Sequence, residues 1–269
     1  MPPVPGPLPL DLRDPLEHAA GRLGAFGRRV LWYPEVGSTN DVALSLADAG
    51  EAEGCIVVAD AQTAGRGRRG RVWASPPGAG IYLSVVLRPP PSVAAFLTLA
   101  AGVAVAEGIE SATGLPTRVK WPNDVFVEGP SAAAGFRKLA GILAEATSRT
   151  AVVLGIGINV QPAAYPPEVA SRATSIESEI GRVVDRGLVL AGCLTALAAR
   201  YDAAREGRMD AVVSAWRSRA SLTFGRRIEW EAGGTIQHGI AHDIDLEGAL
   251  LVRTASGLVR VVSGEVRWI

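Results

Sequence analysis

A glycine- and arginine-rich stretch between two apolar runs constrains this chain more than any other feature. Residues 65–71 (GRGRRGR) hold three glycines and four arginines. Strand-like runs at 55–59 and 81–87 flank the stretch and its following Pro/Gly turn. Glycines let backbone approach a ligand closely, successive N–H groups cradle anions, and arginine binds phosphate or carboxylate bidentately. The pattern predicts an anion-binding loop, mobile while empty because its charges repel, although a solvated basic loop would look the same.

Two familiar phosphate-binding motifs do not fit this stretch. Gly65-x4-Gly70 starts like a Walker A loop, but Arg71 and Val72 stand where Lys and Ser/Thr are required. A dinucleotide fingerprint needs a helix directly after the glycines, and here a strand is expected instead.

Composition sets the size and the setting of the fold. The chain has 269 residues, 48% of them hydrophobic, which suffices for one large domain or for one large and one small domain. Zero formal net charge gives no overall nucleic-acid or membrane signature. Cys55 and Cys193 lie in strand-like and helix-like runs, which indicates buried thiols in a reducing compartment. With no signal peptide or membrane-spanning run recognised, we expect a cytoplasmic protein.

Lysine is nearly absent from this arginine-rich chain. Lys120 and Lys138 are the only lysines among 27 basic residues. Lysine offers a compact ammonium where arginine offers a planar fork, so these two positions either need that ammonium or are there by chance.

The first half of the chain predicts an alternation of helices and strands. Residues 1–10 are expected to be a flexible or extended tail, followed by a helix from Asp14 to about Gly24 and a strand at 30–33. The polar run at 37–41 precedes an amphipathic segment, where helix capping is the favoured interpretation and ligand binding the alternative. A long helix is expected from Ser92 to Gly114.

The next strand is predicted at 118–127, with Pro122 imposing a bulge or bend. That bend would direct four side chains, Lys120, Trp121, Asn123 and Asp124, toward a site, since such polar groups are costly to bury without purpose.

The rest of the chain predicts paired strands, helices and a small β unit. A turn at 128–137 and strands at 138–145 and 151–160 imply antiparallel neighbours. Gly155 and Gly157 suggest that a ligand or another backbone comes close to the last strand. Helical patterns cover 174–180, 186–206 and 208–220. From residue 226, short β pieces separated by glycine turns predict an all-β unit of barrel type.

Together these motifs resemble the biotin protein ligase family over about residues 30–269. The resemblance rests on five segments in the family's order: GSTN at 37–40, the stretch 62–73, KWPND at 120–124, KLAGIL at 138–143 and GIGIN at 155–159. It implies an α/β (α+β) fold, with a mixed seven-stranded biotin/lipoate ligase-like catalytic sheet followed by an SH3-like β-barrel. The implied organisation is a proline-rich tail and short helix at 1–29, a catalytic domain at 30–221 and an SH3-like domain at 222–269.

The resemblance also implies two half-reactions. Biotin and Mg²⁺-ATP form biotinyl-5′-AMP and pyrophosphate, and the biotinyl group then passes to one lysine of a biotin carboxyl carrier domain of an acyl-CoA carboxylase. ATP and Mg²⁺ are the implied cofactors, and biotin is the substrate.

The family pattern assigns roles to residues of this chain. Lys138 and Arg66 are the implied catalytic residues. The implied biotin-binding residues are Ser38, Thr39, Asn40, Gln62, Arg66, Gly67, Arg68 and Lys138. The implied ATP and adenylate contacts are Gly65, Arg66, Arg68, Arg69, Trp73, Asn123, Lys138 and Asn159. Asp124 is the implied metal ligand.

The chain departs from repressor-type members in its first thirty residues, which are proline-rich and hold no winged helix-turn-helix pattern. We therefore expect no DNA binding. We also expect no membrane binding, and a monomer or weak homodimer. A lipoate ligase or octanoyltransferase of similar fold is the nearest competing hypothesis, although the polar residues Ser38, Thr39 and Gln62 favour biotin over a purely apolar tail. A non-catalytic sensor built on this fold and a DNA-binding repressor are two more distant hypotheses.

Overall fold

The computed structural model describes residues 3–128, 135–147, 151–220 and 223–269. Its main body is built on a seven-stranded sheet of order β1-β2-β3-β7-β6-β5-β4. The strands are β1 (Val30–Val36), β2 (Ile56–Gln62), β3 (Gly80–Leu87), β4 (Arg118–Lys120), β5 (Asp124–Glu128), β6 (Phe136–Ala146) and β7 (Val152–Asn159). β1 and β2 run parallel and all other neighbours antiparallel, which confirms the expected mixed sheet.

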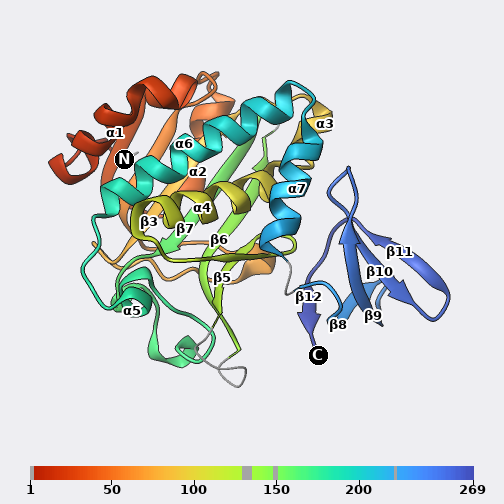
Figure 1. The fold of residues 1–269 in the computed structure, drawn as a ribbon. Helices are drawn as coiled ribbons and strands as arrows, with labels where there is room; N and C mark the ends of the chain where they lie inside the picture. Colours follow the sequence, from red (N-terminus) through yellow and green to blue (C-terminus); the bar gives the residue numbers. More distant parts are fainter. Residues whose placement is uncertain (1–2, 129–134, 148–150, 221–222) are drawn as a thin grey trace.

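One face of the sheet is covered by helices (Figure 1). These are α1 (Leu10–Leu23), α4 (Leu97–Thr113), α6 (Arg186–Arg205) and α7 (Met209–Arg219), with the short α3 (Pro91–Ala94) and α5 (Ile176–Ile180) at the periphery. Their apolar side chains meet alternate residues of β2, β3 and β7, such as Val58, Leu83 and Ile156, in one large core. Of the described helices, α6 is the one whose length and composition would allow it to cross a bilayer, but here it packs between α1 and α4.

The opposite face carries α2 (Thr39–Asp48) and a smaller core. Ala43 and Ala47 of α2 pack there on Val57 of β2 and Val86 of β3, residues that alternate with those of the large core. Because α2 covers only part of this face, the glycine-containing ends of β6 and β7 are left for other groups to contact.

The C-terminal part is a five-stranded antiparallel sheet of order β11-β10-β9-β8-β12 beside the main body (Figure 1). Its strands are β8 (Arg227–Ala232), β9 (Thr235–Ile244), β10 (Leu250–Thr254), β11 (Gly257–Val261) and β12 (Val266–Trp268). It is fastened to the main body by polar contacts. Trp121 donates from Nε1 to the carbonyl of Gly248 (3.0 Å), and Arg217 of α7 donates to both carboxylate oxygens of Asp243 (2.7 and 2.9 Å).

Several local expectations were wrong at the N-terminal end. Helix α1 begins at Leu10 instead of Asp14, so Pro15 is its sixth residue and lacks the N–H that would otherwise bond the carbonyl of Asp11. Of the two forms expected for the stretch before it, the structure shows the extended one, since Gly6 pairs with Trp32 of β1 and covers that edge strand. The helix expected from Ser92 is divided into α3 and α4, and Ser92 does not cap it.

Of the bulge or bend expected at Pro122, the structure shows a bend, which is sharp enough to divide the expected strand in two. Residues 121–123 form a tight turn between β4 and β5, which pair with each other as Lys120 with Asp124. The turn expected at 128–137 lies partly outside the described residues, as does the boundary expected between residues 221 and 222.

Candidate functional site

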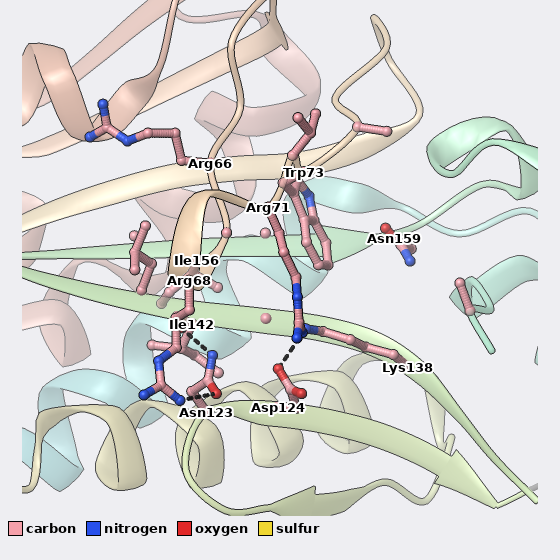
Figure 2. A pocket seen from close by; sticks show the side chains of 18 of the residues that line it. Arg66, Arg68, Arg71, Trp73, Asn123, Asp124, Lys138, Ile142, Ile156 and Asn159 are labelled. Atoms are coloured by element: carbon pink, nitrogen blue, oxygen red, sulfur yellow. Dashed lines mark hydrogen bonds and ion pairs between the residues drawn. The ribbon is translucent and has the colours of Figure 1, made fainter. Parts of the chain in front are cut away.

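A cavity of about 720 Å³ opens on the α2 face of the sheet. Its walls come from the β2–β3 loop, the β4–β5 turn, strands β6 and β7, the segment 164–173 and the C-terminal strand β12. Figure 2 shows Arg68, Asn123, Asp124 and Lys138 gathered at one end of it. All but one of the residues assigned from the family pattern line this cavity. The exception is Gly65, which keeps a structural place because a Cβ there would lie 2.3 Å from the carbonyl oxygen of Trp73.

Buried polar side chains form one end of the cavity. Gln62 Oε1 accepts from the backbone N–H of Thr39 (2.8 Å) and from its hydroxyl (3.2 Å), and Gln62 Nε2 donates to Ser75 Oγ (2.8 Å). The side chain of Ser38, at the N-cap position, makes no capping hydrogen bond. The interpretation of Ser38 as a simple cap was therefore wrong, because Gln62 takes that place from a neighbouring strand and leaves Ser38 lining the cavity.

Asn40 links this polar end to the arginine loop. Its amide donates to Glu145 Oε2 (2.6 Å), and its carbonyl accepts from Ser84 Oγ (2.6 Å). Arg66 donates to the same Glu145 oxygen (2.9 Å) and also pairs with Asp41. Burial lowers the pKa of Arg66, but its bonds to the two carboxylates outweigh that effect and leave the pKa raised.

This pairing separates Arg66 from Lys138, its expected catalytic companion. In Figure 2 the Arg66 guanidinium points away from the Lys138–Asp124 pair, toward α2. The structure therefore places Arg66 at the cavity wall without bringing it to Lys138.

The other loop arginines also have partners, so the expectation of unrelieved repulsion was wrong. Arg71 pairs with Glu265 just before β12, and Arg69 lies 4.0 Å from the same carboxylate. Arg68 donates to Asn123 Oδ1 (3.2 Å) and to the carbonyl of Gly264 (3.1 Å). The loop is thus held against the C-terminal domain by an acidic residue that offsets its charge.

Arg68 differs from its neighbours in having neutral partners. Burial lowers its pKa, and among the described residues no carboxylate lies within 4.0 Å of its guanidinium. It is therefore the loop arginine best suited to receive an anion from solution.

Lys138 lies on β6 at the cationic end of the cavity. Its ammonium is 2.5 Å from Asp124 Oδ1 and 5.3 Å from the centre of the Trp73 ring. Its backbone pairs with the segment beyond β7, accepting from Thr174 N (2.9 Å) and donating to Arg172 O (2.8 Å). The ammonium is thus fixed by its own strand, a counter-ion and an aromatic face.

Glycines in β6 and β7 make room for side chains of other segments. A Cβ on Gly157 would lie 2.6 Å from Trp73 Nε1, one on Gly141 3.1 Å from Trp73 Cζ3, and one on Gly155 2.2 Å from Asn40 Oδ1. The expected close approach is confirmed, and the groups that approach in this structure are side chains. Trp73 lies flat on bare backbone between the two ends of the cavity, and the glycines permit it.

The two predicted asparagines support neighbouring segments. Asn123 Nδ2 donates to Ile142 O (2.8 Å), and buried Asn159 donates to Thr174 O (2.9 Å). Both residues also line the cavity. Their contacts to nucleotide stay a prediction.

Both lysines of the chain line the cavity, which favours the interpretation that an ammonium is needed at each. Lys120 lies 4.2 Å from the ring centre of Trp268 and 5.8 Å from that of Phe126. Burial lowers its pKa.

Sequence reasoning missed four residues of this site. Ser84 and Glu145 complete the network around Asn40, and Glu265 and Trp268 bring the C-terminal strand to the loop and to Lys120. A serine in the otherwise apolar run 81–87 was a usable signal for Ser84. Nothing local marks Glu265 or Trp268, since their partners lie more than a hundred residues away.

The arrangement offers polar groups at one end, cations at the other, and an aromatic platform between them. It suits a ligand with a neutral polar head and an anionic reacting end. Within the described part of the chain, no cluster of three or more His, Cys, Asp or Glu side chains could form a metal cage.

Comparison with known proteins shows that the sequence matches two family models. Residues 33–161 match the model of the biotin/lipoate A/B protein ligase family, and residues 223–267 match the biotin protein ligase C-terminal domain.

Relatives extend that similarity over nearly the whole chain. The biotin–[acetyl-CoA-carboxylase] ligase of Mycobacterium tuberculosis is 38% identical over 96% of this chain and 95% of its own length. The bifunctional ligase/repressor BirA of Bacillus subtilis is 37% identical over 89% of this chain and 74% of its own length. The biotin protein ligase of Aquifex aeolicus, solved with biotin and ATP, superposes with a TM-score of 0.78 at 30% identity, covering 90% of this chain and 99% of that one.

Proposed function

The chain belongs to the biotin protein ligase family, and we propose that it joins biotin to ATP as biotinyl-5′-AMP and passes the biotinyl group to a lysine of a carrier domain of acetyl-CoA carboxylase. One observation supports the proposal most directly. A single cavity holds a polar end around Thr39 and Gln62 and a cationic end around Lys138 and Arg68, with Trp73 between them.

The first half-reaction joins two anions, the biotin carboxylate and the α-phosphate, and the cationic end of the cavity would offset their repulsion. A carboxylate oxygen of biotin attacks the α-phosphorus, the bond to the bridging oxygen breaks, and pyrophosphate leaves with the electron pair. Two unit charges 4 Å apart repel by about 4 kcal/mol at an effective dielectric constant near 20. We assign Lys138 to bridge the carboxylate and the α-phosphate, with Arg68 as the second cation, because these charges are already in place before the reaction.

The polar end suits the ureido ring of biotin, which presents both donors and an acceptor. Ser38, Thr39 and Gln62 supply hydroxyls and an amide at one wall of the cavity. A lipoyl or octanoyl tail offers no such groups, so the Ser38 hydroxyl and the second N–H of Gln62 Nε2 would find no partner on it, at a cost of roughly 1–3 kcal/mol each. The lipoate hypothesis is not favoured for this reason.

The mixed anhydride must be kept from water until the carrier lysine arrives. The backbone of 65–68 and the indole of Trp73 cover the sheet where the two ends of the cavity meet. We assign them to enclose the adenylate, with Asn123, Asn159 and Arg69 on the nucleotide side and Asn40 and Gly67 on the biotin side.

Magnesium fits this site only as a partner of the ATP phosphates. Asp124 is a carboxylate at the reacting end, but it stands alone and already pairs with Lys138. Mg²⁺ commonly binds through one or two carboxylates plus substrate phosphates, so Asp124 is the residue that would hold it. When bound, the ion would neutralise phosphate charge, while Asp124 also positions the Lys138 ammonium.

The setting of the enzyme is part of the same proposal. Two buried free thiols suit a reducing compartment such as the cytosol, and subcellular fractionation would test that location. We propose a monomer or weak homodimer without operator DNA binding or membrane binding. Sedimentation and a low-salt gel shift test the first two statements.

Biotin-dependent exchange between ATP and pyrophosphate tests the activity. Wild type should exchange only with biotin present, and Lys138→Ala should lose the exchange by two to four orders of magnitude. Arg253→Ala, which removes an exposed cation on β10 outside the cavity, is the matched control and should exchange like wild type. Exchange that lipoate supports and biotin does not would reassign the substrate, and no exchange with any acid would reject the adenylation step.

A further inference from the structure

Lys120 is a cation that neither the biotin nor the adenylate assignment uses. It comes from β4, and its ammonium lies over the Trp268 ring of the C-terminal strand at 4.2 Å. No described carboxylate lies within 4.0 Å of it, and it faces the rings of Trp268 and Phe126 instead. An ammonium has three donors to satisfy, so this one lies ready for an acceptor from outside the chain.

The carboxylates nearest to Lys120 are engaged elsewhere. Asp124 and Glu265 are the acidic groups that act on it electrostatically, but Asp124 binds Lys138 and Glu265 binds Arg71. Cations therefore outnumber carboxylates at this end of the cavity. The cations are Lys120, Lys138, Arg68, Arg69 and Arg71, and the carboxylates are Asp124 and Glu265.

Lys120 and Arg68 flank the same turn. Arg68 donates to Asn123, the residue that precedes Asp124, while Lys120 stands opposite Asp124 in the β4–β5 pair. Lys138 reaches that turn from the other side through Asp124. Lys120 and Arg68, neither of which has a direct carboxylate partner among the described residues, thus lie next to the reacting end, on its C-terminal-domain side.

We propose that Lys120 and Arg68 bind the diphosphate part of ATP that leaves as pyrophosphate, and that Trp268 positions Lys120 for it. The inference rests on the proposed function, because it names a subsite of the same cavity. It gives the C-terminal strand a role in the first half-reaction alone: the carrier-transfer step involves no pyrophosphate.

The test compares the two half-reactions in Lys120→Gln. In ATP–pyrophosphate exchange at saturating ATP and biotin, the KM for pyrophosphate should rise about tenfold to hundredfold, the loss expected for one hydrogen bond to a charged group. Transfer from preformed biotinyl-5′-AMP to the carrier domain should stay within twofold of wild type. Lys120→Arg, which keeps the charge, should recover part of the pyrophosphate KM, and Arg253→Gln should change neither step.

An unchanged KM for pyrophosphate overturns the proposal, and so does an equal loss in both half-reactions, which would indicate a structural role. If Lys120→Gln fails to fold, Trp268→Leu keeps both cations and removes only the ring beneath the ammonium. It should raise the same KM several-fold, and an unchanged value overturns the proposal. Calorimetric titration of the protein with inorganic pyrophosphate tests the subsite independently of the proposed function. Tighter pyrophosphate binding by wild type than by Lys120→Gln would support the subsite even if biotin adenylation were not the reaction of this protein.

Discussion

The indole of Trp73 lies against the bare backbone of Gly157, so that a Cβ at Gly157 would stand 2.6 Å from Trp73 Nε1. The same ring faces the Lys138 ammonium at 5.3 Å. A glycine in a central strand therefore determines how deep the indole lies and how far it stands from the Lys138 ammonium. The absence of a Cβ at Gly157 thus affects the spacing between Trp73 and Lys138 in the cavity.

Gly157→Ala is expected to displace Trp73 and weaken nucleotide binding. The contact is too short for any real Cβ, so the ring must move away from the sheet. We expect the KM for ATP to rise about tenfold or more, which corresponds to about 1.4 kcal/mol, while the KM for biotin changes less.

Gly21→Ala is the matched control for this substitution. A Cβ at Gly21 would meet nothing within 4 Å, and the residue lies in helix α1. That change should leave both KM values unaltered and stabilise the fold by about 0.5–1 kcal/mol, measured by denaturant unfolding. Equal ATP kinetics in Gly157→Ala and wild type would show that the ring position does not matter.

Asp124→Asn separates positioning of Lys138 from metal binding. The substitution keeps the size of the side chain and removes the charge that lies 2.5 Å from the ammonium. If Asp124 chiefly positions Lys138, kcat for adenylation should fall about tenfold to a hundredfold with the Mg²⁺ requirement unchanged. If it also holds Mg²⁺, the Mg²⁺ concentration for half-maximal rate should rise as well, so titration with Mg²⁺ decides between the two. Wild-type kinetics in the variant would exclude both roles.

Much of the fold could be predicted from local sequence patterns. The apolar runs predicted the strands β2, β3, β6 and β7, and glycine turns predicted the five strands of the C-terminal sheet. The predicted ends of helices were wrong where tertiary contacts override the local sequence preference. Helix α1 starts four residues early because its first turn packs against α6, where Asp11 O lies close to Gly187.

The site was predicted in its parts and not in its connections. Motif residues such as Lys138 and Asn123 do line one cavity, and their types suit an anionic ligand, while their roles stay predictions. The pairing of Arg71 with Glu265 could not be foreseen, because residues 194 positions apart meet only once the two domains pack. Repulsion within the arginine stretch was overestimated for the same reason.

Glu265→Gln is expected to loosen the arginine loop. Glu265 is the acidic partner of Arg71 and lies near Arg69 on the C-terminal side. Exposed ion pairs contribute on the order of 0.2–1 kcal/mol, so the effect should be local: faster amide hydrogen exchange at 65–72 with little change in global stability. Glu247→Gln, in an exposed ion pair with Arg260 away from the cavity, is the control and should leave exchange at 65–72 unchanged.

In wild type, protonation of Glu265 at low pH should speed amide hydrogen exchange at 65–72 as Glu265→Gln does. The hydrogen bond from Arg71 lowers the pKa of Glu265 below its ordinary value of 4.5. A lowered folded-state pKa contributes stability above the unfolded value, and that contribution is lost as the pH falls from about 4.5 through the folded value. The difference in loop exchange between wild type and Glu265→Gln, corrected for the intrinsic rate, should therefore shrink over that range. A difference that persists below it would assign the effect to something other than the carboxylate charge.

The buried thiols of Cys55 and Cys193 should lower the free energy of unfolding at alkaline pH. Burial raises the pKa of Cys55 to about 11 and that of Cys193 to about 12, from an ordinary value of 9.0. A raised folded-state pKa means that the unfolded chain gives up these protons first, so stability falls as the pH rises from about 9 through 11. Both thiols should resist a disulfide reagent at pH 8 and react fully in denaturant. In Cys55→Ala/Cys193→Ala, part of the alkaline decline in unfolding free energy should disappear. Rapid labelling of either thiol in the native protein would contradict its burial.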